Sequence, residues 1–217
     1  MTPALPLLTR RALVAMALTP AFLGVVAANA APKPDSAVDM AKVLAAGPLS
    51  ELSVGDPAGV PVIEYGSLTC PHCAHFAKEI YPGLKTAFVD TGKVRFIFRE
   101  YSRNNLDVAA FMLARCVGDD KALATIDLLF AEQEKWAFVD KPLDGLTGAL
   151  RPTGMTRDKI EACLKDQKKA DAFAQIVKTA DDTVKVSGTP TFVIDGKVYG
   201  GALSIDDFTA ILKPIIK

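Results

Sequence analysis

Two cysteines separated by two residues are the part of this sequence best suited to chemistry. Cys70 and Cys73 enclose Pro71 and His72, and the four lie between an apolar run that ends at Tyr65 and an amphipathic stretch. This order predicts a strand, a short turn and a helix whose first turn carries Cys70. Unpaired backbone N–H groups and the helix dipole favour an anion there, so the Cys70 thiolate should be stabilised. The pattern therefore predicts thiol–disulfide exchange.

The position of each cysteine on the expected helix predicts its role. Cys70 comes first and should be the more exposed sulfur, so it is the expected nucleophile. Cys73 lies one turn later, should be shielded, and is the expected resolving thiol. His72 could donate to the thiolate or stabilise its charge. An inert disulfide is the alternative, but closing so short a loop removes little chain entropy.

Zinc binding is the competing chemistry, because both histidines of the chain, His72 and His75, lie in this window. On a helix with about 100° per residue, His75 points roughly 140° away from Cys70. Four ligands could then not converge on a tetrahedral ion without unwinding the helix. We therefore expect no metal and no other cofactor, and His75 should be a surface or packing residue.

Glu64 interrupts the apolar strand that precedes the cysteines. A carboxyl group buried at this position should have a raised pKa and could carry protons to or from Cys73. A paired glutamate that is merely tolerated in the strand is the alternative.

The composition is that of an ordinary globular protein. Of the 217 residues, 50% are hydrophobic, and the formal net charge is zero. This is enough material for a full hydrophobic core. Since no run of like charges occurs, nothing suggests nucleic acid or an anionic membrane as a partner.

The first thirty residues differ in kind from the rest of the chain. An arginine pair precedes an apolar stretch at 12–27, and small residues at 28–30 fit a cleavage site. We expect residues 1–30 to be a cleaved signal peptide and the mature protein to lie in the periplasm. A membrane anchor is the alternative, but the stretch is shorter than the roughly 20 residues of a spanning helix and contains Pro20. The arginine pair leaves the export route, general secretory or twin-arginine, open.

Hydrophobic periodicity places the cysteines in an alternating α/β arrangement. Residues 60–65 and 94–98 have the pattern of buried strands, and residues 70–90 between them that of a helix which Pro82 should kink or divide. The connection is long enough for a parallel βαβ unit. Residues 31–36, which contain two prolines, are expected to be a loose leader.

The next part of the chain carries no strand pattern. Apolar residues recur there at helical spacing on several faces, which predicts a helical insertion. A longer helix over 168–185 should return the chain to the sheet. We therefore divide the mature chain into a first thioredoxin-type part, 31–104, a helical insertion domain, 105–166, and a second thioredoxin-type part, 167–217.

The end of the chain has two clear local signals. Residues 192–194 and 197–199 flank an Asp-Gly pair, which is the strongest short-range indication of a β-hairpin. Ser204, with Asp207 three residues later, resembles the capping box of a last helix.

These features together resemble the DsbA-like thiol:disulfide oxidoreductases of the thioredoxin superfamily. A lone Cys-X-X-Cys pair would be a weak signal, but here the motifs come in order. They are Cys70-Pro71-His72-Cys73, Glu64 six residues earlier, the helical insertion, and Gly188-Thr189-Pro190 before the hairpin. The resemblance covers nearly all of the mature chain. It implies an α/β fold, a thioredoxin fold with an inserted all-helical domain.

The resemblance also implies roles for residues outside the cysteine motif. Thr189 and Pro190 match the family's cis-proline loop, which presents its backbone to an extended substrate strand. An ordinary trans turn is the alternative. Glu64 matches the position of an acid that shuttles protons. Thr189 departs from members that have valine there and also occurs in reducing and isomerising relatives, so the direction of catalysis stays more open than the fold.

Cys116 and Cys163 lie on the apolar faces of two different expected helices of the insertion. In an oxidising compartment an even number of cysteines favours disulfides, so we expect a structural Cys116–Cys163 bond beside the redox-active Cys70–Cys73 pair. It would close a loop of about 48 residues and stabilise the fold by roughly 3–4 kcal/mol in the chain-entropy model. Two buried free thiols are the alternative.

The expected function is that of a monomeric dithiol oxidase acting on reduced exported polypeptides. The resemblance implies a membrane quinone-linked reoxidant of the DsbB type. One alternative is an isomerase or reductase kept reduced by a membrane electron donor; such enzymes usually carry an added oligomerisation segment, for which the stretch before the first strand is short. The other is a non-catalytic peptide-binding or chaperone module, against which the intact Cys-Pro-His-Cys argues.

Overall fold

A six-stranded mixed sheet lies at the centre of the computed structural model, which describes Met1 and residues 30–216. Of the expected signal peptide, residues 1–30, only Met1 and Ala30 are described, so the expected cleavage after Ala30 stays a prediction. Among the described residues, no helix combines the length and the hydrophobicity needed to cross a bilayer.

The strands follow the order β1-β6-β5-β3-β4-β2 across the sheet. The pair β3 and β4 is parallel, and the other neighbours are antiparallel. The bounds are β1 (Ser36–Ala37), β2 (Leu52–Val54), β3 (Val60–Gly66), β4 (Val94–Glu100), β5 (Thr191–Ile194) and β6 (Lys197–Gly200). The predicted βαβ unit and the C-terminal hairpin are therefore confirmed.

The expectation of a loose leader before the sheet is wrong at its end. Ser36 pairs with Val198 as the short edge strand β1, and the N–H of Asp35 donates to Val198 O at 2.8 Å. The Asp35 carboxylate also accepts from the N–H of Gly200. The edge of β6 offers backbone groups that need partners, and so short a polar segment carries no hydrophobic period that could have predicted the pairing.

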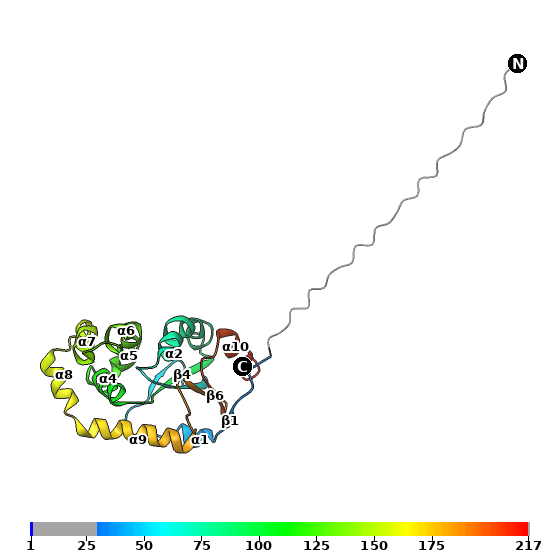
Figure 1. The fold of residues 1–217 in the computed structure, drawn as a ribbon. Coiled ribbons are helices and arrows are strands. Elements are labelled where there is room, and N and C mark those ends of the chain that lie inside the picture. The colour runs from blue at the N-terminus through cyan, green and yellow to red at the C-terminus, as the bar shows by residue number, and fades with distance from the viewer. Residues whose placement is uncertain (2–29, 217) are drawn as a thin grey trace.

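The two faces of the sheet carry separate hydrophobic cores. Along β3, Val62 and Glu64 point to the face with the cysteines, while Ile63 and Tyr65 point to the opposite face. The second face is covered by α9 (Gln167–Thr183) and α1 (Met40–Val43), which lie below the sheet in Figure 1. Alternation along one strand thus places Glu64 on the side of the sheet where the cysteines lie.

Phe76, three residues after Cys73, is the centre of the core on the cysteine face. Its ring centroid lies 4.9 Å from that of Phe192 on β5 and 5.7 Å from that of Phe208 on α10 (Ile205–Leu212). Aromatic pairs in this range add specific geometry to their apolar burial. The packing fixes the helix that carries the cysteines against the sheet and against the last helix.

The helix after the cysteines changes its winding around Pro82. It consists of α2 (Pro71–His75), the π-helical turn η1 (Phe76–Ile80), α3 (Tyr81–Leu84) and a second π-helical turn η2 (Lys85–Val89). The N–H of Tyr81 bonds to Phe76 O, five residues back. Because proline cannot donate and crowds the preceding turn, the chain takes wider turns here instead of ending the helix.

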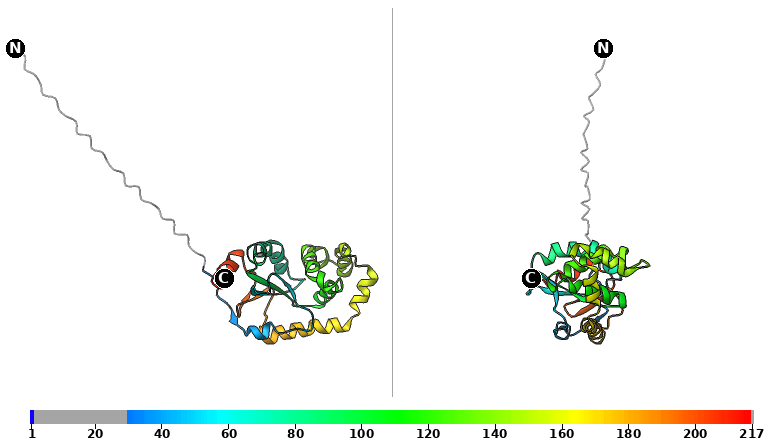
Figure 2. Two further views of the ribbon diagram at one scale, coloured as in Figure 1. Left: turned by 180° about the vertical axis from the view of Figure 1, so that it is seen from behind. Right: turned by 90° about the vertical axis from the view of Figure 1, so that its left-hand side faces the viewer.

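Helices fill the chain between β4 and β5. They are α4 (Asn105–Cys116), η3 (Asp119–Lys121), α5 (Ala122–Ala131), α6 (Gln133–Trp136), α7 (Pro142–Ala149), η4 (Arg151–Thr153) and α8 (Arg157–Leu164). All of them fall inside residues 105–166. The long helix α9 then leads back under the sheet and contacts α4, α1 and β4 (Figures 1 and 2).

Two strong connections hold α4 in place. Cys116 at its end forms a disulfide with Cys163 of α8, with an S–S distance of 2.07 Å. Arg115 donates from Nε to Glu100 Oε1 of β4 at 2.6 Å, and both side chains are almost fully buried. Removing either partner of such a buried ion pair would leave an uncompensated charge, so the pair ties the insertion to the sheet.

The last helix begins with the predicted capping box. The N–H of Asp207 donates to Ser204 Oγ at 3.1 Å, and the N–H of Ser204 donates to the Asp207 carboxylate at 2.9 Å. Two unpaired donors at the helix start are satisfied in this way.

Candidate active site

Cys70 occupies the N-cap of α2, in extended backbone conformation, and Cys73 lies in the first turns of the helix. Pro71 takes the first helical position, where its missing N–H costs nothing. The two cysteines are not bonded to each other, so the structure shows the reduced pair. The strand-to-helix junction predicted from the motif therefore holds the two thiols one turn apart.

The loop before β5 lies against the Cys70 sulfur. Thr189 and Pro190 are joined by a cis peptide bond, and Cys70 Sγ lies 3.2 Å from Thr189 O. A neutral Cys70 thiol donates to this carbonyl. The Thr189 hydroxyl is buried and has no hydrogen-bond partner among the described residues, and the Thr189 side chain helps to lower the pKa of Cys70.

The pKa of Cys70 is lowered to about 4. The main cause is the hydrogen bond that the Cys73 thiol donates to the Cys70 thiolate. Burial opposes the shift, and the Thr189 side chain and the backbone N–H groups of Cys73 and His72 support it. Several donors thus converge on one sulfur at a helix N-terminus, which is how proteins hold a cysteine ionised at neutral pH.

The pKa of Cys73 moves in the opposite direction. Burial raises it, and so do its hydrogen bond to Cys70 and the negative charges of Glu64 and Cys70. The N–H of Ser67, 3.5 Å from the Cys73 sulfur, works weakly against this shift. Cys70 is therefore built to be a thiolate, and Cys73 to hold its proton until a base removes it.

Cys70 is less exposed than the sequence led us to expect. Cys70 is 3% exposed and Cys73 is fully buried, so the order is as expected, but Cys70 is not an open sulfur. His72 and His75 are both exposed. Within the described residues His72 acts on Cys70 through its backbone N–H, and no hydrogen bond joins its imidazole to the sulfur.

Glu64 lies buried on β3 beside the cysteines, with 2% of its surface exposed. Its Oε1 atom has no hydrogen-bond partner among the described residues. Burial raises the pKa of Glu64 well above its usual range, and the charges of Asp127 and Cys70 raise it further. The structure thus places a carboxyl group with a raised pKa close enough to Cys73 to influence its titration.

Gly66 makes room for this carboxyl group. A Cβ atom at Gly66 would lie 3.1 Å from Glu64 Oε1 and 2.5 Å from the Phe98 ring. The second distance is a clash, so a larger residue would push Phe98 and Glu64 apart.

Asp107 of α4 holds the loop that leads into Cys70, and sequence reasoning missed it. Its carboxylate is fully buried. It accepts from Ser67 Oγ at 2.9 Å and from the N–H groups of Thr69 and Arg103 at 2.8 Å each. The only local signal is its place in the first turn of a helix, which is typical of ordinary capping.

Gln133 of α6 holds the same loop from the other side. Its Nε2 atom donates to Leu68 O at 2.7 Å and to Cys70 O at 3.0 Å. Together with Asp107 it fixes the backbone of the cysteine loop from two helices of the insertion. The inserted helices therefore take part in shaping the cysteine site.

Replacing Asp107 with asparagine should lower the free energy of unfolding of the reduced chain by about 2–3 kcal/mol, since buried N–H donors would then face an amide N–H₂ group. Urea unfolding followed by far-UV circular dichroism measures this. Asp158→Asn, in the exposed first turn of α8, is the matched control and should change stability by less than about 1 kcal/mol. Equal effects of the two substitutions would contradict the anchoring role.

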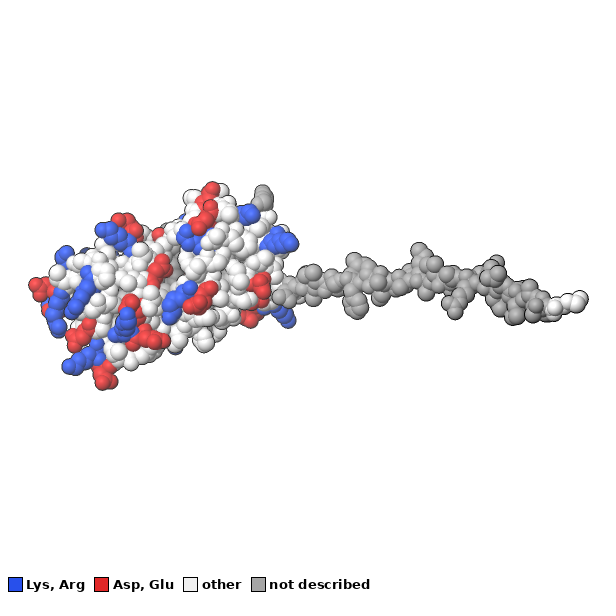
Figure 3. Space-filling view, turned by 90° about the horizontal axis from the view of Figure 1, so that it is seen from above, with Lys and Arg blue, Asp and Glu red and all other residues white. Residues whose placement is uncertain are grey.

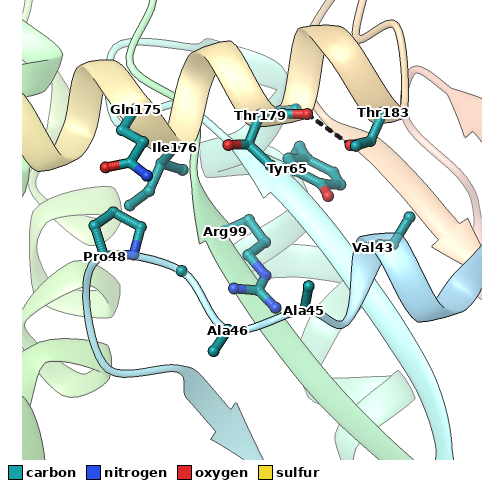
Figure 4. Close-up of a pocket in the computed structure, with 12 residues that line it drawn as sticks. Val43, Ala45, Ala46, Pro48, Tyr65, Arg99, Gln175, Ile176, Thr179 and Thr183 are labelled. Atoms are coloured by element: carbon teal, nitrogen blue, oxygen red, sulfur yellow. Dashed lines mark hydrogen bonds between the residues drawn. The ribbon is translucent and has the colours of Figure 1, made fainter.

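The site includes neither a metal-binding cluster of described residues nor the cavity on the other face of the sheet. Among the described residues, no group of three or more His, Cys, Asp or Glu side chains converges as a metal site. A cavity of about 80 Å³ lies on the opposite face of the sheet, between α9 and residues 45–48, with Tyr65 and Arg99 on its floor (Figure 4). The sheet separates this cavity from the cysteines.

A Cys-X-X-Cys pair at a helix N-terminus, next to a cis-proline loop at the end of a mixed sheet, defines a thioredoxin fold, and the inserted helices make it DsbA-like. The chain belongs to the thioredoxin family, whose family model, described as "Thioredoxin", matches residues 49–214. The predicted resemblance and the predicted fold class, a thioredoxin fold with an inserted helical domain, are thereby confirmed.

Individual relatives agree with this assignment. A Rickettsia felis protein named "Putative protein-disulfide oxidoreductase" is 33% identical over 160 residues, which are 73% of this chain and 57% of that protein. This chain thus spans less than two thirds of that relative. The crystal structure of α-DsbA1 from Wolbachia pipientis has a TM-score of 0.72 at 24% identity, covering 81% of this chain and 95% of that one. A protein-disulfide isomerase structure from Novosphingobium aromaticivorans has a TM-score of 0.63 at 25% identity, covering 76% and 94%.

Proposed function

We propose that this chain is a periplasmic thiol:disulfide oxidase that donates the Cys70–Cys73 disulfide to reduced exported polypeptides. The observation that carries the proposal is the opposite shift of the two cysteine pKa values, down to about 4 for Cys70 and upward for Cys73. A low pKa at the attacked cysteine stabilises the reduced form of the enzyme, and this makes its disulfide a strong oxidant.

The reaction has two exchange steps. A substrate thiolate attacks Cys70 Sγ, the Cys70–Cys73 bond breaks, and Cys73 takes up a proton as it leaves. A second substrate thiolate then attacks the substrate sulfur of the mixed disulfide and expels Cys70 as a thiolate. Two electrons have passed from the substrate dithiol to the enzyme, and the substrate carries the disulfide.

The lowered pKa of Cys70 supports the direction of this transfer. At pH 7 a pKa of about 4 lies three units below ambient pH. Each unit favours the reduced form by about 1.4 kcal/mol, which for a two-electron couple is about 30 mV. Three units therefore shift the potential of the pair by about 90 mV toward oxidation of substrates.

Thr189 and Pro190 are the proposed contact for the substrate chain. Thr189 lies next to the Cys70 sulfur through its carbonyl, and Pro190 has no N–H that could compete with a bound strand. The Pro190 carbonyl already accepts from the N–H of Gly201 at 2.9 Å. An extended polypeptide would therefore pair with the backbone at Thr189, in the manner of strand addition.

The proposed partners follow from the same chemistry. Turnover needs an oxidant for the reduced pair, and we propose a membrane quinone-linked protein of the DsbB type. The periplasmic location is supported by the pattern of residues 1–30 and by the pairing of Cys116 with Cys163. On the face seen from above, positive and negative side chains lie next to one another (Figure 3).

Transfer of a disulfide to a reduced peptide tests the proposal. The oxidised chain, mixed with an unfolded peptide that contains two thiols, should convert one peptide disulfide per chain and become reduced at Cys70 and Cys73. Mass spectrometry after alkylation counts both products. An enzyme that stays oxidised while the peptide stays reduced would contradict the proposal.

Disulfide isomerisation is the second candidate. It is favoured by Thr189, which also occurs in reducing and isomerising relatives, and by the name of the Novosphingobium structure. The redox state of Cys70 in intact cells separates the two functions, because an oxidase is mostly oxidised there and an isomerase mostly reduced.

A further inference from the structure

Glu64 shares a cavity with a second carboxyl group, that of Asp127 on α5. The cavity lies between the sheet, the helix after the cysteines and α5. The volume within it that the centre of a water molecule can occupy is about 30 Å³. A site needs about 10–15 Å³ of such space for each water, together with polar partners. Glu64, Asp127 and the Tyr81 side chain line it, so it can hold water between the two carboxyl groups.

The rest of the cavity wall is apolar. The other lining residues are Val54, Phe76, Ala77, Phe96, Phe98, Leu123, Ile126 and Phe130. None of the described lining residues is a lysine, arginine or histidine. Charges interact more strongly across such a wall than in water, because the effective dielectric constant is lower. The negative charge of Asp127 therefore raises the pKa of Glu64.

Asp127 lies between Glu64 and solvent. Glu64 is 2% exposed, with Oε1 unpaired among the described residues, whereas Asp127 is exposed on its outer side. Burial of its inner side raises the pKa of Asp127, and the Asp127 charge is the largest electrostatic influence that raises the pKa of Glu64. Glu64 thus influences the pKa of Cys73 and shares the cavity with Asp127.

We propose that Asp127 is the outer carboxyl group of a proton path that connects Glu64, and through it Cys73, with solvent. The inference rests on the proposed thiol–disulfide exchange and adds a residue to it. When Cys73 attacks a mixed disulfide at Cys70, its thiol proton passes to the Glu64 carboxylate. The proton leaves through the cavity to Asp127 and then to water. In the oxidising direction the same proton returns along the path to the departing Cys73 thiolate.

The groups that face Glu64 are few, which makes the path testable. Cys70 and Cys73 face it from α2, Tyr81 from α3 and Asp127 from α5, while Phe98 and Phe192 are its neighbours on β4 and β5. Burial raises the pKa of Tyr81, and the Asp127 and Glu64 charges raise it further, so Tyr81 stays neutral. Among the described residues of the cavity wall, Asp127 is thus the one carboxyl group besides Glu64, and it is exposed to solvent.

A reaction with Ellman's reagent separates the two thiols in time. The reduced chain attacks the reagent through Cys70 and releases a first thionitrobenzoate. Cys73 then attacks the mixed disulfide and releases the second, after it has lost its proton. The pH dependence of the second release reports the base that takes this proton. Stopped-flow absorbance from pH 4 to pH 9 measures both releases on the full chain.

Asp127→Asn should lower the midpoint of the second release by on the order of one pH unit, because a negative charge near Glu64 is lost. Asp127→Glu keeps the charge and should keep the wild-type midpoint. In a Glu64→Gln background Asp127→Asn should have no effect. Glu79→Gln removes an exposed charge from the neighbouring helical turn outside the cavity wall and should leave the midpoint unchanged.

Three results would overturn the proposal: an unchanged midpoint in Asp127→Asn, an equal shift in Glu79→Gln, or a shift that persists without Glu64. These results differ from a failure of the proposed function. If the wild-type chain released no thionitrobenzoate at all, exchange at Cys70 itself would be refuted. If exchange proceeds and Asp127→Asn behaves as wild type, the proton path alone is wrong.

Discussion

A Cys73→Ser chain should form mixed disulfides with substrate thiols and then stop. Cys70 keeps its backbone donors and the Thr189 side chain, so it still attacks a disulfide reagent. Without a second sulfur it can neither form an internal disulfide nor release a bound substrate by internal attack. We expect the rate of catalysed disulfide transfer to fall by at least about 10³-fold, as for other residues that act as a unit in covalent catalysis.

Non-reducing gels and intact-mass measurement check this result directly. The Cys73→Ser chain should carry one substrate molecule, bound at Cys70, which a reductant removes. Cys70→Ser is the matched control, because it should form no adduct even though Cys73 is present. Wild-type turnover of the Cys73→Ser chain would contradict the assignment of Cys73 as the resolving thiol.

Replacing Glu64 with glutamine should slow the attack of Cys73 on the mixed disulfide by about 10²-fold at neutral pH, the lower end of what a positioned general base contributes. The cause is the raised pKa of Cys73, which leaves this thiol protonated unless a base takes its proton. The first step, attack by Cys70, should stay close to the wild-type rate. The two releases of the Ellman reaction measure both steps, and an unchanged pH profile of the second would remove the role of Glu64.

The same substitution should change the pH dependence of stability. The pKa of Glu64 is raised in the folded chain, so the protonated carboxyl group contributes to the free energy of unfolding. This contribution is fully present below the unfolded pKa of about 4.3 and is lost as pH rises through the pKa of the folded chain. Glutamine carries no charge at any pH. The free energy of unfolding of the wild type should therefore fall relative to that of Glu64→Gln as pH rises above about 4. Parallel stability curves would contradict a raised pKa.

The fold was open to prediction because its main elements carry strong local patterns. The buried runs at 60–65 and 94–98, the Asp-Gly hairpin and the capping box at Ser204 are each specified by residues close together in the chain. Edge strand β1 was missed because its pairing depends on the free edge of β6, which no local period reveals.

The cysteines and Glu64 were also open to prediction, because a motif and an interrupted strand mark them. The residues that complete the site were not. Asp107 is 38 residues from its loop partner Thr69 in the sequence, and Gln133 is 63 residues from Cys70. Each lies on a helix at a position where a polar residue is common. Asp127 is exposed on α5, where a charged residue normally indicates a solvent face. Only tertiary packing gives these three their place beside the thiols.

The pKa of the Cys70 thiol is the measurement that tests the account most directly. Thiolate absorbance at 240 nm, recorded for the reduced chain against the oxidised chain from pH 2 to pH 9, gives it. The lowered pKa means that the stabilisation of the reduced fold is complete above the free-thiol pKa of about 8.5 and is lost as pH falls through the folded value. We predict a midpoint at about 4. A midpoint near 8.5, as in free cysteine, would contradict the account.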